Sequence, residues 1–146
     1  MSAFHPLPNN WFRLLRLSPN TPEHTSYELG SFELGHSPCY NALSYCWGEL
    51  ERSIPIQCNG STMMITPHLE EAIACLGTLK RDTEWIWIDQ ICINQDDDLE
   101  RALQVSMMKD IYTSSEGTII WLGSHVEDIE TVPPFLRVFQ PFIIEI

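Results

Sequence analysis

The sequence predicts an α/β fold in which a mostly parallel central sheet is flanked by helices. Between residues 40 and 123, three apolar strand-like segments alternate with two segments whose apolar residues recur at helical spacing. This alternation is typical of a parallel sheet, because each helix carries the chain back to the edge from which the next strand starts. Hydrophobic residues make up 44% of the 146 residues, which is enough for one core.

Two strands and an irregular end precede this alternating region. Residues 1–10 are rich in proline and asparagine, and we expect them to be disordered. The segment WFRLLRL at 11–17 favours a strand in which Arg13 and Arg16 reach solvent, and residues 27–34 favour a weaker strand. Both strands are expected to extend an edge of the sheet or to form a small subsheet.

The first strand of the alternating region is expected at residues 40–48. Bulky and small side chains alternate along it, so that one face is large and the other small. The small face suits the close approach of another backbone or of a ligand. Residues 54–58 and 63–65 then flank Asn59-Gly60, a pair that favours the positive φ angles of a type I′ hairpin turn.

The signals of a helix follow this hairpin. Thr66 is a good N-cap, Pro67 fits the first helical position, and Lys80 and Arg81 suit the negative end of the helix dipole. The apolar stripe of this helix is Leu69, Ala72, Ile73, Leu76 and Leu79.

The strongest strand signal is EWIWIDQICI at residues 84–93. Both of its faces are apolar, which is expected of a central strand covered on both sides. A helix over about 99–112 follows, with Asp97 as its N-cap and Glu100 completing a capping box. Its apolar residues lie around most of its circumference, so we expect this helix to be largely buried. The last strand is expected at residues 117–123.

The composition argues against several classes of function. The formal net charge of −12 disfavours binding to nucleic acid and gives no attraction to anionic membranes. Two interpretations of this charge stay open: simple solubility, or a basic partner or cation near residues 96–98. No apolar run reaches the roughly 20 residues of a membrane span, and no secretory signal is seen. The five cysteines form no C-x-x-C pair, so we expect a cytoplasmic protein with free, buried thiols and no metal site.

Three segments carry a specific combination of motifs. They are ALSYCWG at 42–48, WIDQICINQ at 87–95 followed by Glu100-Arg101, and the stretch from Gln104-Val105 to Trp121-Leu122-Gly123. In this order and spacing they resemble the fungal heterokaryon-incompatibility (HET) domain family, over about residues 11–123. The resemblance implies non-self recognition between fungal strains, in which the domain triggers programmed cell death through protein partners or self-association.

The resemblance also implies a fold and an alternative activity. A similarity of the family to Toll/interleukin-receptor (TIR) domains implies a TIR-like or flavodoxin-like three-layer arrangement. Some TIR domains cleave NAD with a glutamate, so NAD is a candidate substrate, whereas no resident cofactor is implied. Residues 124–146, which contain Pro133-Pro134 and Pro141, do not continue the family's pattern. We therefore expect a C-terminally truncated domain, and an inert remnant is a third interpretation beside the docking module and the NAD hydrolase.

Ligands of open α/β sheets bind at the carboxyl ends of the strands, and three groups of polar residues fall there. Asp89 ends a heavily apolar strand, so burial should raise its pKa unless a partner such as Arg101 compensates. Asp89 either forms an ion pair or cap that holds its loop, or contacts a ribose hydroxyl and performs general acid–base work. The three groups are Ser44, Trp47, Gly48 and Glu49; Asp89, Cys92, Asn94 and Gln95; and Ser124 and His125.

Three carboxylates are candidates for catalysis: Glu100, Glu49 and Asp89. Glu100 either stabilises the start of its helix or steadies a ribosyl cation during NAD cleavage, and Glu49 is an equal contender by position. Cys92 is more consistent with a small core residue than with a nucleophile, because no histidine stands at a telling spacing. The candidate ligand-binding residues are Ser44, Trp47, Gly48, Asn94, Gln95 and Arg101.

Overall fold

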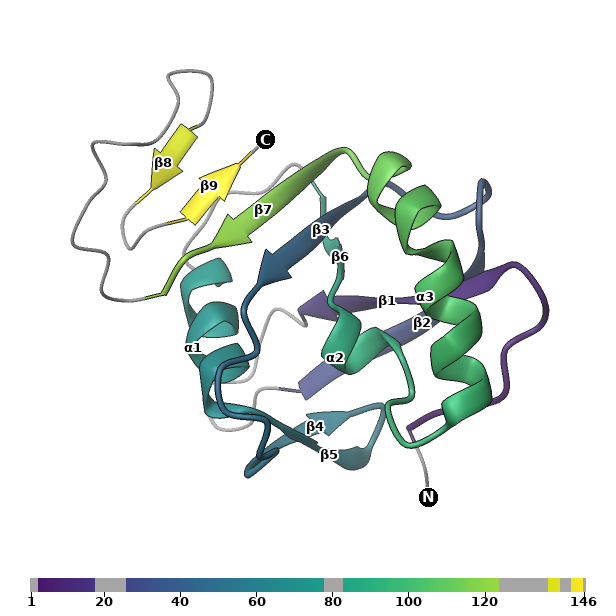
Figure 1. The fold of residues 1–146 in the computed structure, drawn as a ribbon, viewed down its shortest axis with the longest axis horizontal. Helices are drawn as coiled ribbons and strands as arrows, with labels where there is room; N and C mark the ends of the chain where they lie inside the picture. The colour runs from purple at the N-terminus through teal and green to yellow at the C-terminus, as the bar shows by residue number, and fades with distance from the viewer. Residues whose placement is uncertain (1–2, 18–25, 78–82, 124–136, 140–142, 146) are drawn as a thin grey trace.

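The computed structural model of the chain describes residues 3–17, 26–77, 83–123, 137–139 and 143–145 (Figure 1). Its strands form one sheet in the order β5-β4-β2-β1-β6-β3-β7-β9-β8. The elements are β1 (Trp11–Leu17), β2 (Ser26–Glu33), β3 (Tyr40–Tyr45), β4 (Ile54–Cys58), β5 (Ser61–Ile65), α1 (Pro67–Leu76), β6 (Trp85–Trp87), α2 (Asp89–Cys92), α3 (Asp98–Thr113), β7 (Gly117–Trp121), β8 (Arg137–Phe139) and β9 (Ile143–Glu145).

The centre of the sheet has the predicted parallel arrangement. Strand β3 lies between β6 and β7 and runs parallel to both of them. The sheet as a whole is mixed and not mostly parallel, because β1 pairs antiparallel with β2 and β6, and β9 pairs antiparallel with β7 and β8. Strand β2 also pairs parallel with β4, and β4 pairs antiparallel with β5. A short turn joins β4 to β5, whereas a connection that contains α3 carries the chain from β6 to β7. The N-terminal strands and the hairpin therefore extend one edge, as predicted.

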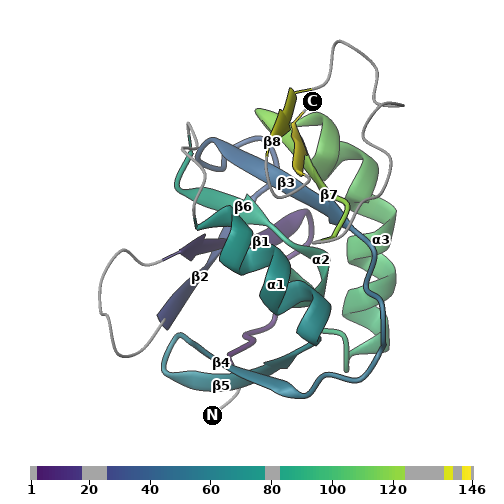
Figure 2. The ribbon, with the colours of Figure 1, turned by 90° about the vertical axis from the view of Figure 1, so that its left-hand side faces the viewer.

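Helices cover both faces of the central strands, as a three-layer arrangement requires (Figures 1 and 2). On one face, the ring of Trp87 in β6 packs edge-on against Tyr112 of α3, with 5.2 Å between centroids. On the other face, Trp121 of β7 contacts His68 of α1 at 4.4 Å. The pairing of β3 with its two neighbours places these tryptophans on opposite faces, because side chains alternate along each strand.

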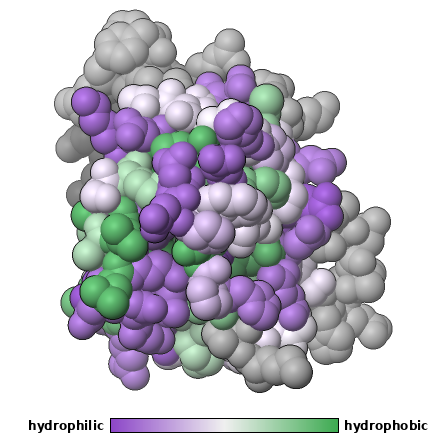
Figure 3. All heavy atoms as spheres, turned by 90° about the vertical axis from the view of Figure 1, so that its right-hand side faces the viewer, coloured by the Kyte–Doolittle hydropathy of each residue, from purple (hydrophilic) through white to green (hydrophobic). Residues whose placement is uncertain are grey.

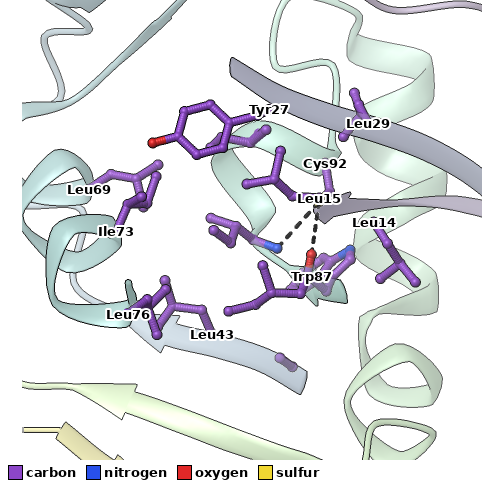
Figure 4. Close-up of a cluster of buried hydrophobic side chains, with 14 of the residues drawn as sticks. Leu14, Leu15, Tyr27, Leu29, Leu43, Leu69, Ile73, Leu76, Trp87 and Cys92 are labelled. Atoms are coloured by element: carbon purple, nitrogen blue, oxygen red, sulfur yellow. Dashed lines mark hydrogen bonds between the residues drawn. The ribbon is translucent and has the colours of Figure 1, made fainter. Parts of the chain in front are cut away.

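Helix α1 begins where the sequence predicts. Thr66 accepts the backbone N–H of Leu69 as N-cap, and Pro67 occupies the first turn. Residues 79–81 of the predicted stripe and last turn lie outside the described residues. The buried face of α1 packs on the sheet beside Leu43 (Figure 4). The residues of this face are Leu69, Ala72, Ile73 and Leu76.

The hairpin of β4 and β5 also follows the prediction. Asn59 and Gly60 have φ angles of 50° and 75°, the left-handed values that a type I′ turn needs. The side chain of Asn59 accepts the N–H of Leu29 and donates to its carbonyl, at 3.0 and 2.9 Å. These two bonds attach the hairpin to β2, which explains why the hairpin joins the main sheet.

The strand predicted at 84–93 is shorter than expected. Strand β6 ends at Trp87, and the chain then forms the single helical turn α2. In this turn the N–H of Cys92 donates to the Ile88 carbonyl at 2.7 Å, and the Asp89 carboxylate accepts the N–H of the adjacent Gln90 at 2.7 Å. The apolar residues of this segment are buried in either conformation, so their pattern alone does not distinguish strand from helix.

Helix α3 is not largely buried, which corrects the expectation from its composition. Of its residues only Gln104 and Ile111 are buried, whereas Leu99, Leu103 and Val105 are 80, 59 and 55% exposed. The helix lies on the outside of the sheet (Figure 2). Within the described residues, no helix is long and apolar enough to cross a membrane.

Arg13 likewise departs from the prediction, because its side chain does not reach solvent and the residue is buried. Residues 3–10, for which the sequence predicts disorder, cover this arginine. The carbonyl of His5 accepts from its Nη2 at 2.7 Å, and the ring of Phe4 lies 4.9 Å from its guanidinium carbon. Arg16 does remain partly exposed and pairs with Glu28.

Candidate functional site

The carboxyl ends of the parallel strands bring Trp47 and Asp89 together, as the sequence predicts. The indole Nε1 of Trp47 donates to Asp89 Oδ2 at 2.9 Å, across two segments that are remote in the chain. The other carboxylate oxygen accepts the N–H of Gln90 at 2.7 Å, and the hydroxyl of Tyr45 also bonds to the carboxylate. Asp89 is therefore the centre of a half-buried polar cluster at one edge of the sheet, which we call the Asp89 cluster.

Gln90 extends the Asp89 cluster to α1. Its Oε1 accepts the backbone N–H of Thr66 at 2.8 Å, and its Nε2 donates to Thr66 Oγ1 at 3.2 Å. The same Nε2 donates to the Tyr45 hydroxyl at 3.3 Å. One hydrogen-bond network thus joins the strand ends, the N-cap of α1 and the start of α2. Each group in this network constrains the others.

The electrostatics of the cluster follow from its burial. Desolvation raises the pKa of the Asp89 carboxyl above its ordinary value, although the hydrogen bonds from Trp47, Gln90 and Tyr45 act in the opposite direction. Burial and the neighbouring Asp89 also raise the pKa of Tyr45 strongly. Desolvation raises the pKa of the fully buried Cys92 thiol to about 12, which suits the predicted core residue and not a nucleophile.

Gly48 follows Trp47 of the cluster and lies close to His68 of α1. Gly48 has a φ of 68°, and a Cβ on it would lie 3.3 Å from Cγ of His68. The glycine therefore permits the chain after β3 to pass close to the imidazole, which itself packs against Trp121. The sequence contains no local pattern that predicts the position of His68 beside Gly48.

A hollow of about 540 Å³ opens beside Gln90, between the β4–β5 hairpin and the segment after α2. Asn94 and Gln95, two predicted ligand-binding residues, line this hollow. Gln95 Nε2 also donates to the backbone carbonyl of Asp89 at 3.0 Å, so the hollow and the Asp89 cluster are adjacent. Arg52 closes one side through an ion pair with Asp96 at 2.6 Å.

Glu100 lies in a different environment from Asp89. Its carboxylate accepts from the buried guanidinium of Arg13 at 2.5 and 3.0 Å, and from the N–H of Asn94 at 2.8 Å. Asp97 caps α3 as predicted by accepting the N–H groups of Leu99 and Glu100. The capping box does not close, because Glu100 turns inward to Arg13.

The remaining candidates are dispersed. Arg101 is not the partner of Asp89; it donates to Asp98 at 2.7 Å and to the carbonyl of Gln95 at 2.9 Å. Ser44 faces the other side of the sheet, where it bonds to the hydroxyl of Tyr112. Glu49 is exposed in the segment that follows β3. Ser124 and His125 lie outside the described residues.

The cysteines and the other side chains that can bind metals form no second candidate site within the described residues. Within the described residues none of the five cysteines forms a disulfide, as predicted, but Cys39 and Cys46 are exposed and not buried. In the described ranges, no three side chains of His, Cys, Asp or Glu gather closely enough to hold a metal ion.

Comparison with known proteins gives this geometry a family context. The family described as "Heterokaryon incompatibility protein (HET)" matches residues 40–140, which is more than half of the chain. The chain belongs to the HET family. The matched range contains β3, α2 and α3, and so it includes both partners of the bond between Trp47 and Asp89.

A curated relative supports the same assignment. The HET chain is 40% identical to "Heterokaryon incompatibility protein 6, OR allele" of Neurospora crassa, over 73% of its own length. It spans only 18% of that protein's length. No solved structure matches the chain.

Proposed function

We propose that this HET-family chain acts in non-self recognition between fungal strains, where it triggers programmed cell death by docking with protein partners in the cytoplasm. The observation that carries the proposal is the 40% identity to a heterokaryon incompatibility protein over 73% of the chain. The bond between Trp47 and Asp89 supports it, because it joins two segments of the chain that carry the family's motifs.

The hydrogen bonding of the carboxylates favours docking over catalysis. Asp89 accepts from Trp47 and from the N–H of Gln90, and Glu100 accepts from Arg13 and the N–H of Asn94. A carboxylate that is already bonded to fixed protein donors must break those bonds before it can contact a reacting group. Both carboxylates are therefore better suited to holding a surface in place than to chemistry.

The test is induced expression of the full chain in fungal cells, with viability and protein level measured together. We expect viability to fall after induction, relative to the uninduced culture. Trp47→Phe, which keeps the ring and removes the indole donor, should weaken this effect, whereas Glu28→Gln on an exposed pair should not. Normal growth at a confirmed level of folded parent protein would reject the proposal and favour an inert remnant.

The alternative function is the hydrolysis of NAD by a TIR-like mechanism. It is favoured by the position of Asp89, which adjoins a hollow lined by Asn94 and Gln95, and by the burial that raises the pKa of its carboxyl. In this alternative Asp89 is a stronger candidate than Glu100 or Glu49, because it alone of the three lies in the cluster at the strand ends. Release of nicotinamide from NAD by the purified chain, lost in Asp89→Asn, would favour the enzyme over the docking module.

A further inference from the structure

The outer face of α3 carries a second hollow, which is separate from the Asp89 cluster. It has a volume of about 520 Å³ and lies between α3 and the segment 6–11 that leads into β1. We call it the α3 groove. Its apolar lining comes from both walls, with Leu7, Pro8 and Trp11 on one side and Leu103 and Met107 on the other. Figure 3 shows this side of the molecule, where apolar residues in green lie among hydrophilic ones in purple.

Exposed leucines continue the apolar lining along the helix. Leu103 lines the groove and is 59% exposed, and Leu99, one turn earlier, is 80% exposed. Residues four apart lie on the same face of a helix, so these two side chains form one apolar strip. A single exposed leucine needs no explanation, but an apolar strip beside a groove is typical of a surface that binds a partner.

The floor of the groove contains a buried amide. Gln104 is 3% exposed, and its Nε2 donates to the carbonyl of Trp11 at 2.8 Å. A carbonyl oxygen can only accept a hydrogen bond, so the amide nitrogen of Gln104 must face it. The amide oxygen Oε1 therefore points away from the Trp11 carbonyl. Within the described residues, Oε1 has no hydrogen-bond partner. A buried acceptor without a partner is unfavourable, and Gln104 is one of the residues that line the groove.

The charge around the groove determines which partner fits. Asp97 and Glu100 line it, and Asp96 and Asp98 adjoin it in the sequence. Glu100 is neutralised by Arg13, and Asp96 and Asp98 form ion pairs with Arg52 and Arg101. Among the described residues Asp97 is therefore the acidic lining residue without an ion pair, and the whole chain carries a formal net charge of −12. A second copy would bring the same charge against this face, and nucleic acid would be repelled as well. A basic protein segment is attracted.

We propose that the α3 groove binds a segment of a partner protein that carries a bulky apolar side chain next to lysine or arginine. The apolar side chain enters between Leu103 and Trp11, and the basic side chains face the acidic rim that includes Asp97. This inference rests on the proposed docking function and deepens it by naming the surface and the chemistry of the partner. Its test measures binding directly, so its failure is distinguishable from a failure to cause cell death.

The experiment selects short random peptides displayed on phage against the purified full chain. Selected peptides are then synthesised, labelled and titrated by fluorescence anisotropy. We expect enrichment of sequences in which Leu, Phe or Trp is next to Lys or Arg. Their affinity should fall about tenfold in Leu103→Ser and in Leu99→Ser, and it should weaken as salt is raised. Both leucines are exposed, so the variants should keep the parent's melting temperature, which circular dichroism checks.

Leu50 lies outside the groove and supplies the matched control. Leu50→Ser removes a leucine that is 75% exposed and does not line the groove, and peptide affinity should stay unchanged. The proposal is overturned if no sequence is enriched, if the enriched peptides are acidic or uncharged, or if Leu103→Ser binds them as the parent does. A dimer in sedimentation equilibrium that Leu103→Ser abolishes would assign the face to a second copy instead. Peptide binding lost while cell death is retained would reject the groove and leave the proposed function standing.

Discussion

The buried ion pair of Arg13 and Glu100 allows a sharp test of what holds α3 to the sheet. The perturbation is Glu100→Gln, which removes one negative charge and keeps the size of the side chain. Arg13 donates twice to this carboxylate, at 2.5 and 3.0 Å, and its side chain has a relative exposure of only 2%. The variant would leave a guanidinium buried without its counter-ion.

The expected magnitude follows from the bonds that survive. Arg13 keeps the carbonyls of Cys92 and His5, at 3.2 and 2.7 Å, and the new amide retains one acceptor oxygen. Breaking a buried pair by removing one partner typically costs about 3–5 kcal/mol. Because two neutral acceptors remain on Arg13, we expect a loss near the lower limit, about 3 kcal/mol in the free energy of unfolding.

The assay is equilibrium unfolding in urea, with Glu28→Gln as the matched control. Glu28 pairs with Arg16, but both side chains are partly exposed, so its loss should cost less than about 1 kcal/mol. The double variant Arg13→Met with Glu100→Gln should be more stable than the sum of the single losses predicts, since no isolated charge then remains buried. Equal losses for Glu100→Gln and Glu28→Gln, or strict additivity in the double variant, would refute this reasoning.

Three further predictions concern the core, the Asp89 cluster and the start of α1. Trp87 is fully buried in the central strand β6, so Trp87→Ala should cost about 3–5 kcal/mol in urea unfolding, and a normally stable variant would contradict the sheet assignment. The folded chain binds the Asp89 proton more tightly than the unfolded chain, because burial raises the pKa. Stability should therefore fall, relative to Asp89→Asn, as pH rises from the ordinary aspartate pKa of about 3.9 to the raised value, and parallel curves would count against the shift. Thr66→Ala should cost about 1–2 kcal/mol through the lost cap, whereas Thr66→Ser should cost much less, and equal losses in thermal unfolding would show that the hydroxyl is unimportant.

Local signals explain which parts of the fold the sequence predicted. The turn at Asn59-Gly60 and the cap at Thr66 depend on residues within a few positions, and the structure confirms both. The meeting of Trp47 and Asp89 is not local, but it followed from one topological rule, since parallel strands end at the same edge. Such contacts are predictable once the direction of each strand is known.

Contacts that depend on no such rule were missed. Arg13 is buried because it pairs with Glu100, which is 87 positions away in the sequence. A short apolar strand gives no sign of such a distant pairing. The extent of burial of α3 was also missed, because periodicity shows which faces are apolar and not how many neighbours cover them. No sequence signal predicted that Gln90 belongs to the Asp89 cluster, because Gln90 lies in an apolar run that favoured a continuous strand.

The position of Glu100 changes how a search for catalysis should be interpreted. An analogy with NAD-cleaving domains selects a glutamate, and Glu100 is conspicuous because it lies in the first turn of α3, next to a family motif. Yet this carboxylate joins β1 to α3 through Arg13, so its removal destabilises the fold whether or not NAD is cleaved. Loss of activity in Glu100→Ala alone therefore identifies no catalyst. Asp89→Asn is the informative comparison, because it keeps the size of the side chain and removes a charge whose burial is already unfavourable. Only a variant that loses activity at unchanged stability would place chemistry at this edge of the sheet.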